Sequence, residues 1–192
     1  MASHSEADPT RALRNLLRSL TREFFQTETS AVRHCRREAE RLGQSPPAQV
    51  LREISEQADG VLRELPSLMK AHDLPVSPAG VAVGALFSET RDKLLDRLTR
   101  SERSYRGTML GVRHGVDLVL LYGYTARAGG LYELSAFCER WLAARRPLVA
   151  RLEESLGWFA QQPTQAVQVA RPLLVPRESR RAPASTARAA SP

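Results

Sequence analysis

The residues best suited to acid–base chemistry lie close together in the sequence, at Arg113, His114 and Asp117. In a helix, Asp117 follows His114 by three residues and Arg113 by four, so the three side chains share one face. A His–Asp pair at this spacing can act as a general acid or base. The spacing is also typical of a polar surface cluster held by ion pairs. We favour the surface cluster and predict no catalytic residues, because the sequence contains no nucleophile beside a base, no P-loop and no dinucleotide-binding fingerprint.

Four other polar residues fall on stripes that are otherwise apolar. These residues are Glu38, His72, Glu102 and Arg145. They would form a buried polar site if they met at one level of a helical protein. The short turn at 128–130 fixes the register of the two helices around it and places Glu102 opposite Ser155. It places Arg145 opposite Val112. Glu102 and Arg145 are therefore about 15 Å apart along the bundle axis. We therefore expect separate features, ion-paired inside the protein or reaching solvent at helix ends.

Three glycines at four-residue spacing, Gly107, Gly111 and Gly115, lie inside an expected helix. Each interior glycine costs about 1 kcal/mol of helix stability relative to alanine, so their common register predicts a surface that something approaches closely. Ser104 and Thr108 fall in the same angular sector and extend this close-packing face. The face fits packing against another helix of the same chain, a dimer contact or a ligand cleft.

The composition favours an all-α protein, since apolar residues are mainly Leu, Ala and Val and aromatic residues make up only 6% of the chain. Residues 1–8 and 161–192 have no apolar periodicity, which predicts a disordered N-terminus and a disordered tail. The tail, rich in Pro, Ala, Arg and Ser, holds +4 of the net charge of +7. It could contact nucleic acid, although it lacks interleaved aromatic residues.

Helix signals divide residues 9–160 into four long helices, expected at about 9–42, 46–71, 89–126 and 131–160. A capping residue followed by proline marks three starts, at Asp8-Pro9, Ser45-Pro46 and Ser77-Pro78. Glycines mark two ends, at Gly43 and at Gly129-Gly130. Pro66 should kink or locally break the helix over 46–71, and Pro147 should kink the helix over 131–160. We expect an antiparallel four-helix bundle, with a short extra helix or a crossover connection at 75–88.

The tract ERSYRGTMLGVRHGVDL and the four-helix pattern over residues 9–160 resemble the ferritin-like superfamily of bacterial proteins. The di-iron members of that superfamily use Glu-x-x-His motifs on two helices. No glutamate in this chain is followed three residues later by histidine. The available carboxylates are each expected to be solvated or ion-paired. They are Glu23, Glu28, Glu56, Glu102, Glu133 and Glu139. Cys35 and Cys138 fit no metal-ligand pattern, so we expect neither a metal nor another cofactor.

These patterns favour a non-enzymatic, cytoplasmic helical protein that acts through protein–protein contact, with a protein partner or as a homodimer. No segment is long and apolar enough for a membrane span, and two cysteines without a pairing pattern fit a reducing compartment. Two alternatives stay open. One is a ferritin-like protein with a degenerate or unusual metal or ligand site, and the other is nucleic-acid contact through residues 161–192.

Overall fold

The structure is a computed structural model that describes residues 8–74 and 100–169. Four long helices make up most of it: α1 (Pro9–Leu42), α2 (Pro46–Ala71), α4 (Ser101–Ala128) and α5 (Tyr132–Glu154). Two short helices follow, α6 (Leu156–Gln161) and α7 (Pro163–Ala166). The described ranges contain no strand, and the expected all-α class is confirmed for them.

Local signals set the ends of these helices. The Asp8 carboxylate accepts a hydrogen bond from the Thr10 N–H at 3.0 Å and caps α1, as the sequence predicts. Gly43 ends α1 with a φ of 64°, and Gly130 has a φ of 73° in the turn after α4. Helices α2 and α5 continue through Pro66 and Pro147, so the local break that was one expectation at Pro66 does not occur.

The predicted helix over 89–126 begins later than expected, at Ser101. Arg100 has an extended backbone and pairs with Val169 in an isolated antiparallel bridge, so the helix cannot run through it. Residues 89–99 lie outside the described ranges, as do the Ser77-Pro78 start and the segment 75–88.

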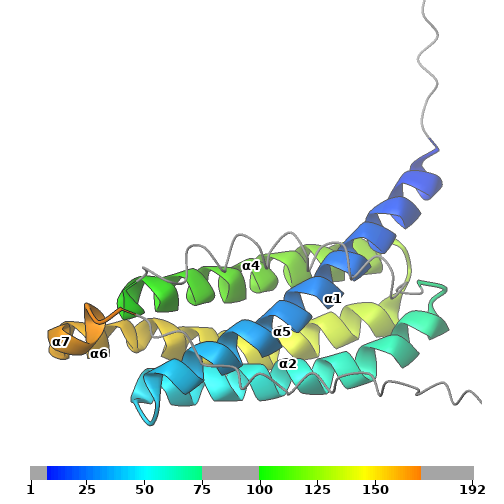
Figure 1. The fold of residues 1–192 in the computed structure, drawn as a ribbon. Helices are drawn as coiled ribbons and strands as arrows, with labels where there is room; N and C mark the ends of the chain where they lie inside the picture. Colours follow the sequence, from blue (N-terminus) through cyan, green and yellow to red (C-terminus); the bar gives the residue numbers. More distant parts are fainter. Residues whose placement is uncertain (1–7, 75–99, 170–192) are drawn as a thin grey trace, which may run out of the picture.

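Each long helix runs antiparallel to the two long helices that it contacts (Figure 1). Helix α1 contacts α2 and α4, and α5 contacts the same two helices from the other side. Contacts between α4 and α5 match the register predicted from their short turn: the Tyr105 hydroxyl donates to the Leu152 carbonyl at 2.7 Å. Helices α2 and α4 therefore run in the same direction.

Two apolar clusters fill the interior. The first centres on Phe24, which is fully buried, with ring centroids of Tyr122, Phe137 and Trp141 at 6.1, 6.2 and 5.7 Å. The second lies toward the α1–α2 turn and includes Tyr105, whose ring centroid is 5.0 Å from that of Phe159. Both tyrosine hydroxyls are satisfied, since Tyr122 also shares a 2.6 Å hydrogen bond with Thr21.

The ordered fold extends beyond the predicted boundary at residue 160. Helix α7 buries Ala166 in the second cluster, and the Ser101 N–H donates to the Gln168 carbonyl at 2.9 Å. The expectation of disorder over 161–192 is therefore wrong for residues 161–169. Pro163 at the first helical position starts a helix too short to show apolar periodicity.

Candidate functional site

The four polar residues on apolar stripes do not meet. Glu38 is buried and accepts hydrogen bonds from Ser104 at 2.6 Å and from Arg41 at 3.3 Å. The His72 Nε2 atom lies 3.6 Å from Glu133 Oε2, near the far end of α2. Glu102 is partly exposed and pairs with Arg106 one turn later. The expected separation agrees with the structure, and only Arg145 lies at the centre.

Arg145 belongs to a polar cluster that is buried except for the partly exposed Gln57, and that the sequence pattern did not predict. Its Nη2 atom donates to Glu28 Oε2 at 2.9 Å, and its Nε atom donates to Gln57 Oε1 at 2.6 Å. The Trp141 indole N–H donates to the same Glu28 oxygen at 3.3 Å. The Arg145 Cζ atom also lies 4.7 Å from the centroid of the Trp141 ring, within range of a cation–π interaction. These residues, Glu28, Gln57, Trp141 and Arg145, are called the central cluster below.

Helices α1, α2 and α5 position the central cluster between the two apolar clusters. Glu28 lies one turn after Phe24 and two turns before Cys35, and all three side chains are completely buried. Arg145 follows Trp141 by one turn and is 1% exposed. A signal for Glu28 was present in the sequence, since it interrupts the apolar stripe of α1 at helical spacing. Its partner was not evident, because no short turn fixes the register of α1 against α5.

Desolvation dominates the electrostatics of the central cluster. Burial raises the pKa of the Glu28 carboxyl, while the Arg145 charge beside it acts in the opposite direction. Burial likewise lowers the pKa of Arg145, opposed by Glu28. The nearby Cys35 thiol is also buried, which raises its pKa to about 12. A thiol with so high a pKa is a poor nucleophile at neutral pH.

The central cluster is chemically suited to a structural ion pair. The Arg145 guanidinium lies directly on the Glu28 carboxylate, where a metal in a carboxylate site would have to bind. Glu28 Oε1 is buried without a hydrogen-bond partner among the described residues. No group of three or more His, Cys, Asp or Glu side chains in residues 8–74 and 100–169 is placed to hold a metal ion.

The predicted polar cluster on α4 is at the surface, but its partners come from other helices. Arg113 Nε donates to Glu153 Oε1 on α5 at 2.9 Å. The His114 Nε2 atom lies 3.1 Å from Glu23 Oε1 on α1. The structure therefore pairs His114 with Glu23 and does not form the His–Asp pair with Asp117. The surface interpretation agrees with the exposure of Arg113, His114 and Asp117.

The close-packing face of α4 divides into two parts. A Cβ atom added at Gly115 would lie 3.1 Å from Thr27 Cγ2 and 3.8 Å from Trp141 Cη2, so this glycine lets α1 and α5 approach α4. A Cβ at Gly107 or Gly111 would meet no described atom within 4 Å, and both positions are exposed. Ser104 and Thr108 are partly buried. Packing within the described part of the chain thus accounts for Gly115 but not for Gly107 or Gly111.

The open surroundings of Gly111 and the crowded surroundings of Gly115 predict different effects of alanine substitution on stability. In the monomer, Gly111→Ala should raise the free energy of unfolding by about 0.5–1 kcal/mol through higher helix propensity. Gly115→Ala gains the same propensity but crowds Thr27, so we expect it to be neutral or destabilising. Urea unfolding of both variants at low protein concentration measures the difference. Equal stabilisation by both substitutions would contradict close packing at Gly115.

Large apolar side chains are exposed on the same helix. Leu110, Leu121 and Tyr124 expose 69%, 49% and 65% of their surface. At 100° per residue, Leu110 and Leu121 lie within 20° of each other around the axis of α4, with the exposed His114 and Asp117 between them along the axis, and Gly107 lies about 60° from Leu110. The residues Gly107, Leu110, Gly111, Leu121 and Tyr124 are called the α4 face below. No helix in residues 8–74 and 100–169 combines the length and the hydrophobicity that crossing a bilayer requires.

Comparison of the chain with known proteins gives no assignment. No protein-family model matches it, and neither a curated protein nor a solved structure is significantly similar to it.

Proposed function

We propose that the chain is a non-enzymatic helical protein that acts through protein–protein contact, and that the α4 face binds a second copy of the same chain. The observation that carries this proposal is the exposure of Leu110 beside two glycines whose surroundings are open. Three of the large apolar residues that the described part of the chain exposes lie on α4, next to two glycines without a neighbour. Exposed apolar surface of this kind marks interaction sites.

The arrangement of the α4 face supports a symmetric contact. Gly107 and Gly111 form a shallow strip, because neither has a side chain, and Leu110 projects from the helix about 60–100° to one side of them. In a two-fold pair of α4 helices, Leu110 of one copy would fit over the glycine strip of the other. The same patch supplies the projection and the recess, as an isologous interface requires. The missing side chains would let the two helices approach closely.

The central cluster supports the non-enzymatic part of the proposal. Its cation, carboxylate and indole bind one another and are shielded from solvent, so no substrate can reach them without local opening. We place the protein in the cytoplasm, since its cysteines, Cys35 and Cys138, are free and buried.

Sedimentation velocity of the full chain tests self-association. Leu110→Glu places a charge at the centre of the proposed contact and should shift the dimer to monomer across the micromolar range. Tyr132→Glu is the matched control, because Tyr132 is 70% exposed but lies on α5. Loss of the dimer with Leu110→Glu alone supports the proposal. A wild-type chain that stays monomeric, or equal effects of the two substitutions, would contradict it.

A second candidate, a ferritin-like protein with an altered site, has one observation in its favour. Helices α2 and α4 run in the same direction while the long helices in contact are antiparallel, an arrangement typical of ferritin-like folds. The residues present do not fit a di-iron centre, because Arg145 lies on the one carboxylate buried at the middle of the fold. The third candidate is nucleic-acid contact through residues 161–192. The structure describes residues 161–169 of this tail.

Metal analysis separates the first two candidates. We expect less than about 0.1 transition-metal ion per chain after expression with added iron, manganese or zinc, because binding would require displacing the Arg145 guanidinium from Glu28. Elemental analysis of the purified protein provides the measurement. One or two tightly held ions per chain would favour the ferritin-like alternative.

A further inference from the structure

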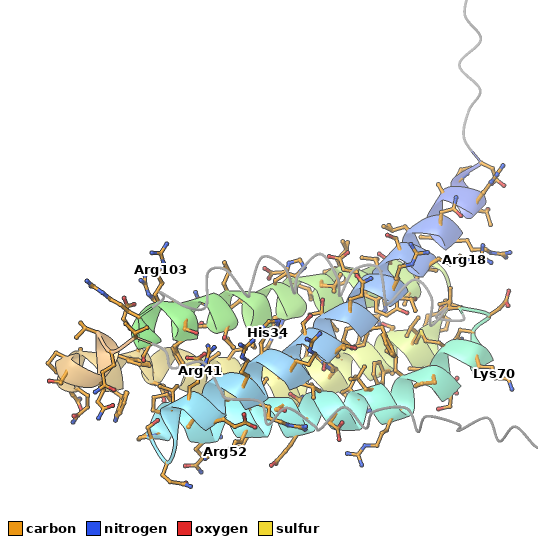
Figure 2. The ribbon with its side chains drawn as sticks, in the orientation of Figure 1. Arg18, His34, Arg41, Arg52, Lys70 and Arg103 are labelled. Atoms are coloured by element: carbon orange, nitrogen blue, oxygen red, sulfur yellow. The ribbon has the colours of Figure 1, made fainter. Side chains whose placement is uncertain are left out.

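The first half of α1 has an unusually one-sided charge. Between Asp8 and Glu23 the chain contains arginines but no acidic residue. The arginines are Arg11, Arg14, Arg18 and Arg22, and all four are exposed. In Figure 1 this part of α1 projects beyond the ends of the neighbouring helices, and in Figure 2 Arg18 points away from them.

The four arginines lie on one side of the helix. At 100° per residue they fall within a sector of about 80°, and they extend over roughly 16 Å along the axis. They are called the arginine face below. No ion pair among the described residues involves them. Other exposed arginines do have acidic partners, such as Arg63 with Asp59 and Arg140 with Glu64. The arginine face is therefore a concentration of positive charge that the described fold does not neutralise.

Most of the opposite side of the same helix segment is already occupied, although Leu16 is 42% exposed. Leu17 and Leu20 are 5% and 4% exposed and belong to the first apolar cluster. A basic amphipathic helix that binds a membrane surface inserts its apolar side between the lipids. Here Leu17 and Leu20 pack inside the protein and leave only Leu16 for insertion, so a partner is recognised mainly by charge from the solvent side.

We propose that the arginine face binds the phosphodiester backbone of a nucleic acid. A row of arginines fits this ligand because each guanidinium can form paired hydrogen bonds to phosphate oxygens, and phosphates repeat regularly along a strand. Asn15 and Ser19 lie beside the arginines and can also donate to phosphates. The contact is electrostatic and independent of sequence. It is also independent of the α4 face, which lies on another helix.

Fluorescence anisotropy of the full chain with labelled duplexes of about 20 base pairs, one DNA and one RNA, tests this proposal. The variant R11Q/R14Q/R18Q/R22Q removes the arginine face. The matched control R63Q/K70Q/R140Q/R146Q removes the same charge from exposed positions on α2 and α5. Titrations between about 50 and 200 mM salt give the salt dependence of the affinity.

Four phosphate contacts predict a slope of about −3.6 in log K against log salt, which corresponds to roughly a 150-fold loss of affinity over this range. We expect the arginine-face variant to bind at least tenfold more weakly and to lose about this much slope, while the control changes less than about twofold. Comparison of the affinities for the DNA and RNA duplexes shows which nucleic acid the protein prefers. Three outcomes would overturn the proposal: no wild-type binding, equal losses in both variants, or binding to phosphatidylserine vesicles but to neither duplex.

Discussion

Replacing Glu28 by leucine is expected to lower the free energy of unfolding by about 3–5 kcal/mol. The substitution leaves the Arg145 guanidinium charged, 1% exposed and without its acidic partner. It also removes the acceptor of the Trp141 indole N–H. Burying an unpaired charge costs more than the apolar surface of leucine can return. Chemical denaturation followed by circular dichroism measures the loss.

A double-mutant cycle separates the ion pair from simple packing effects. Arg145→Met alone should also destabilise by roughly 3 kcal/mol or more, because it leaves the Glu28 carboxylate buried without its counterion. The double variant Glu28→Leu/Arg145→Met should recover most of the loss, since no unpaired charge remains. Additive losses in the double variant would show that the two residues do not act as a buried pair.

Truncation of Phe24 is the second large effect that we expect, with Phe24→Ala costing about 3–5 kcal/mol. The Phe24 ring is completely buried and contacts three aromatic rings, one on α4 and two on α5. Its removal leaves a cavity at the point where α1 is held against both helices. Phe24→Leu retains most of the volume and should cost only about 1–2 kcal/mol. Thermal unfolding of both variants tests this; equal costs would indicate that the site collapses around either side chain.

The sequence predicted the helices well because their signals are local. The Asp8 cap, the Gly43 stop and the Gly129-Gly130 turn act through neighbouring residues, and each appears in the structure as expected. The predicted register of α4 and α5 also agrees, because a short turn leaves little freedom. The end of the fold was harder to predict. Residues 161–169 are held by contacts with α4 that no local pattern reveals.

The central cluster could be predicted only in part. Arg145 was recognised as a polar residue on an apolar stripe, and ion pairing inside the protein was one expectation for it. Glu28 was treated as one carboxylate among several, because its burial depends on α1 lying against α5. Gln57 gave no signal at all, since a glutamine on a partly buried helix is unremarkable until its neighbour is known.

The glycines show the same limit of local reasoning. Their spacing predicted a single close-packing face, yet α1 and α5 approach only Gly115. Helical periodicity assigns residues to a sector but does not show how far along the sector a neighbouring helix extends. The structure shows that extent for the described residues and leaves Gly107 and Gly111 open on the α4 face.

Site-directed cross-linking at Gly111 tests the central claim, self-association through the α4 face, most directly. In a close two-fold pair of α4 helices, the two copies of residue 111 would approach within the roughly 4.4–6.8 Å that a disulfide bridges between Cα atoms. We predict that Gly111→Cys forms a covalent dimer under mild oxidation, because the native cysteines are buried. Ala136→Cys, at an exposed position on α5, should stay monomeric under the same conditions. Equal yields from the two variants, or no covalent dimer from Gly111→Cys, would contradict the proposed contact.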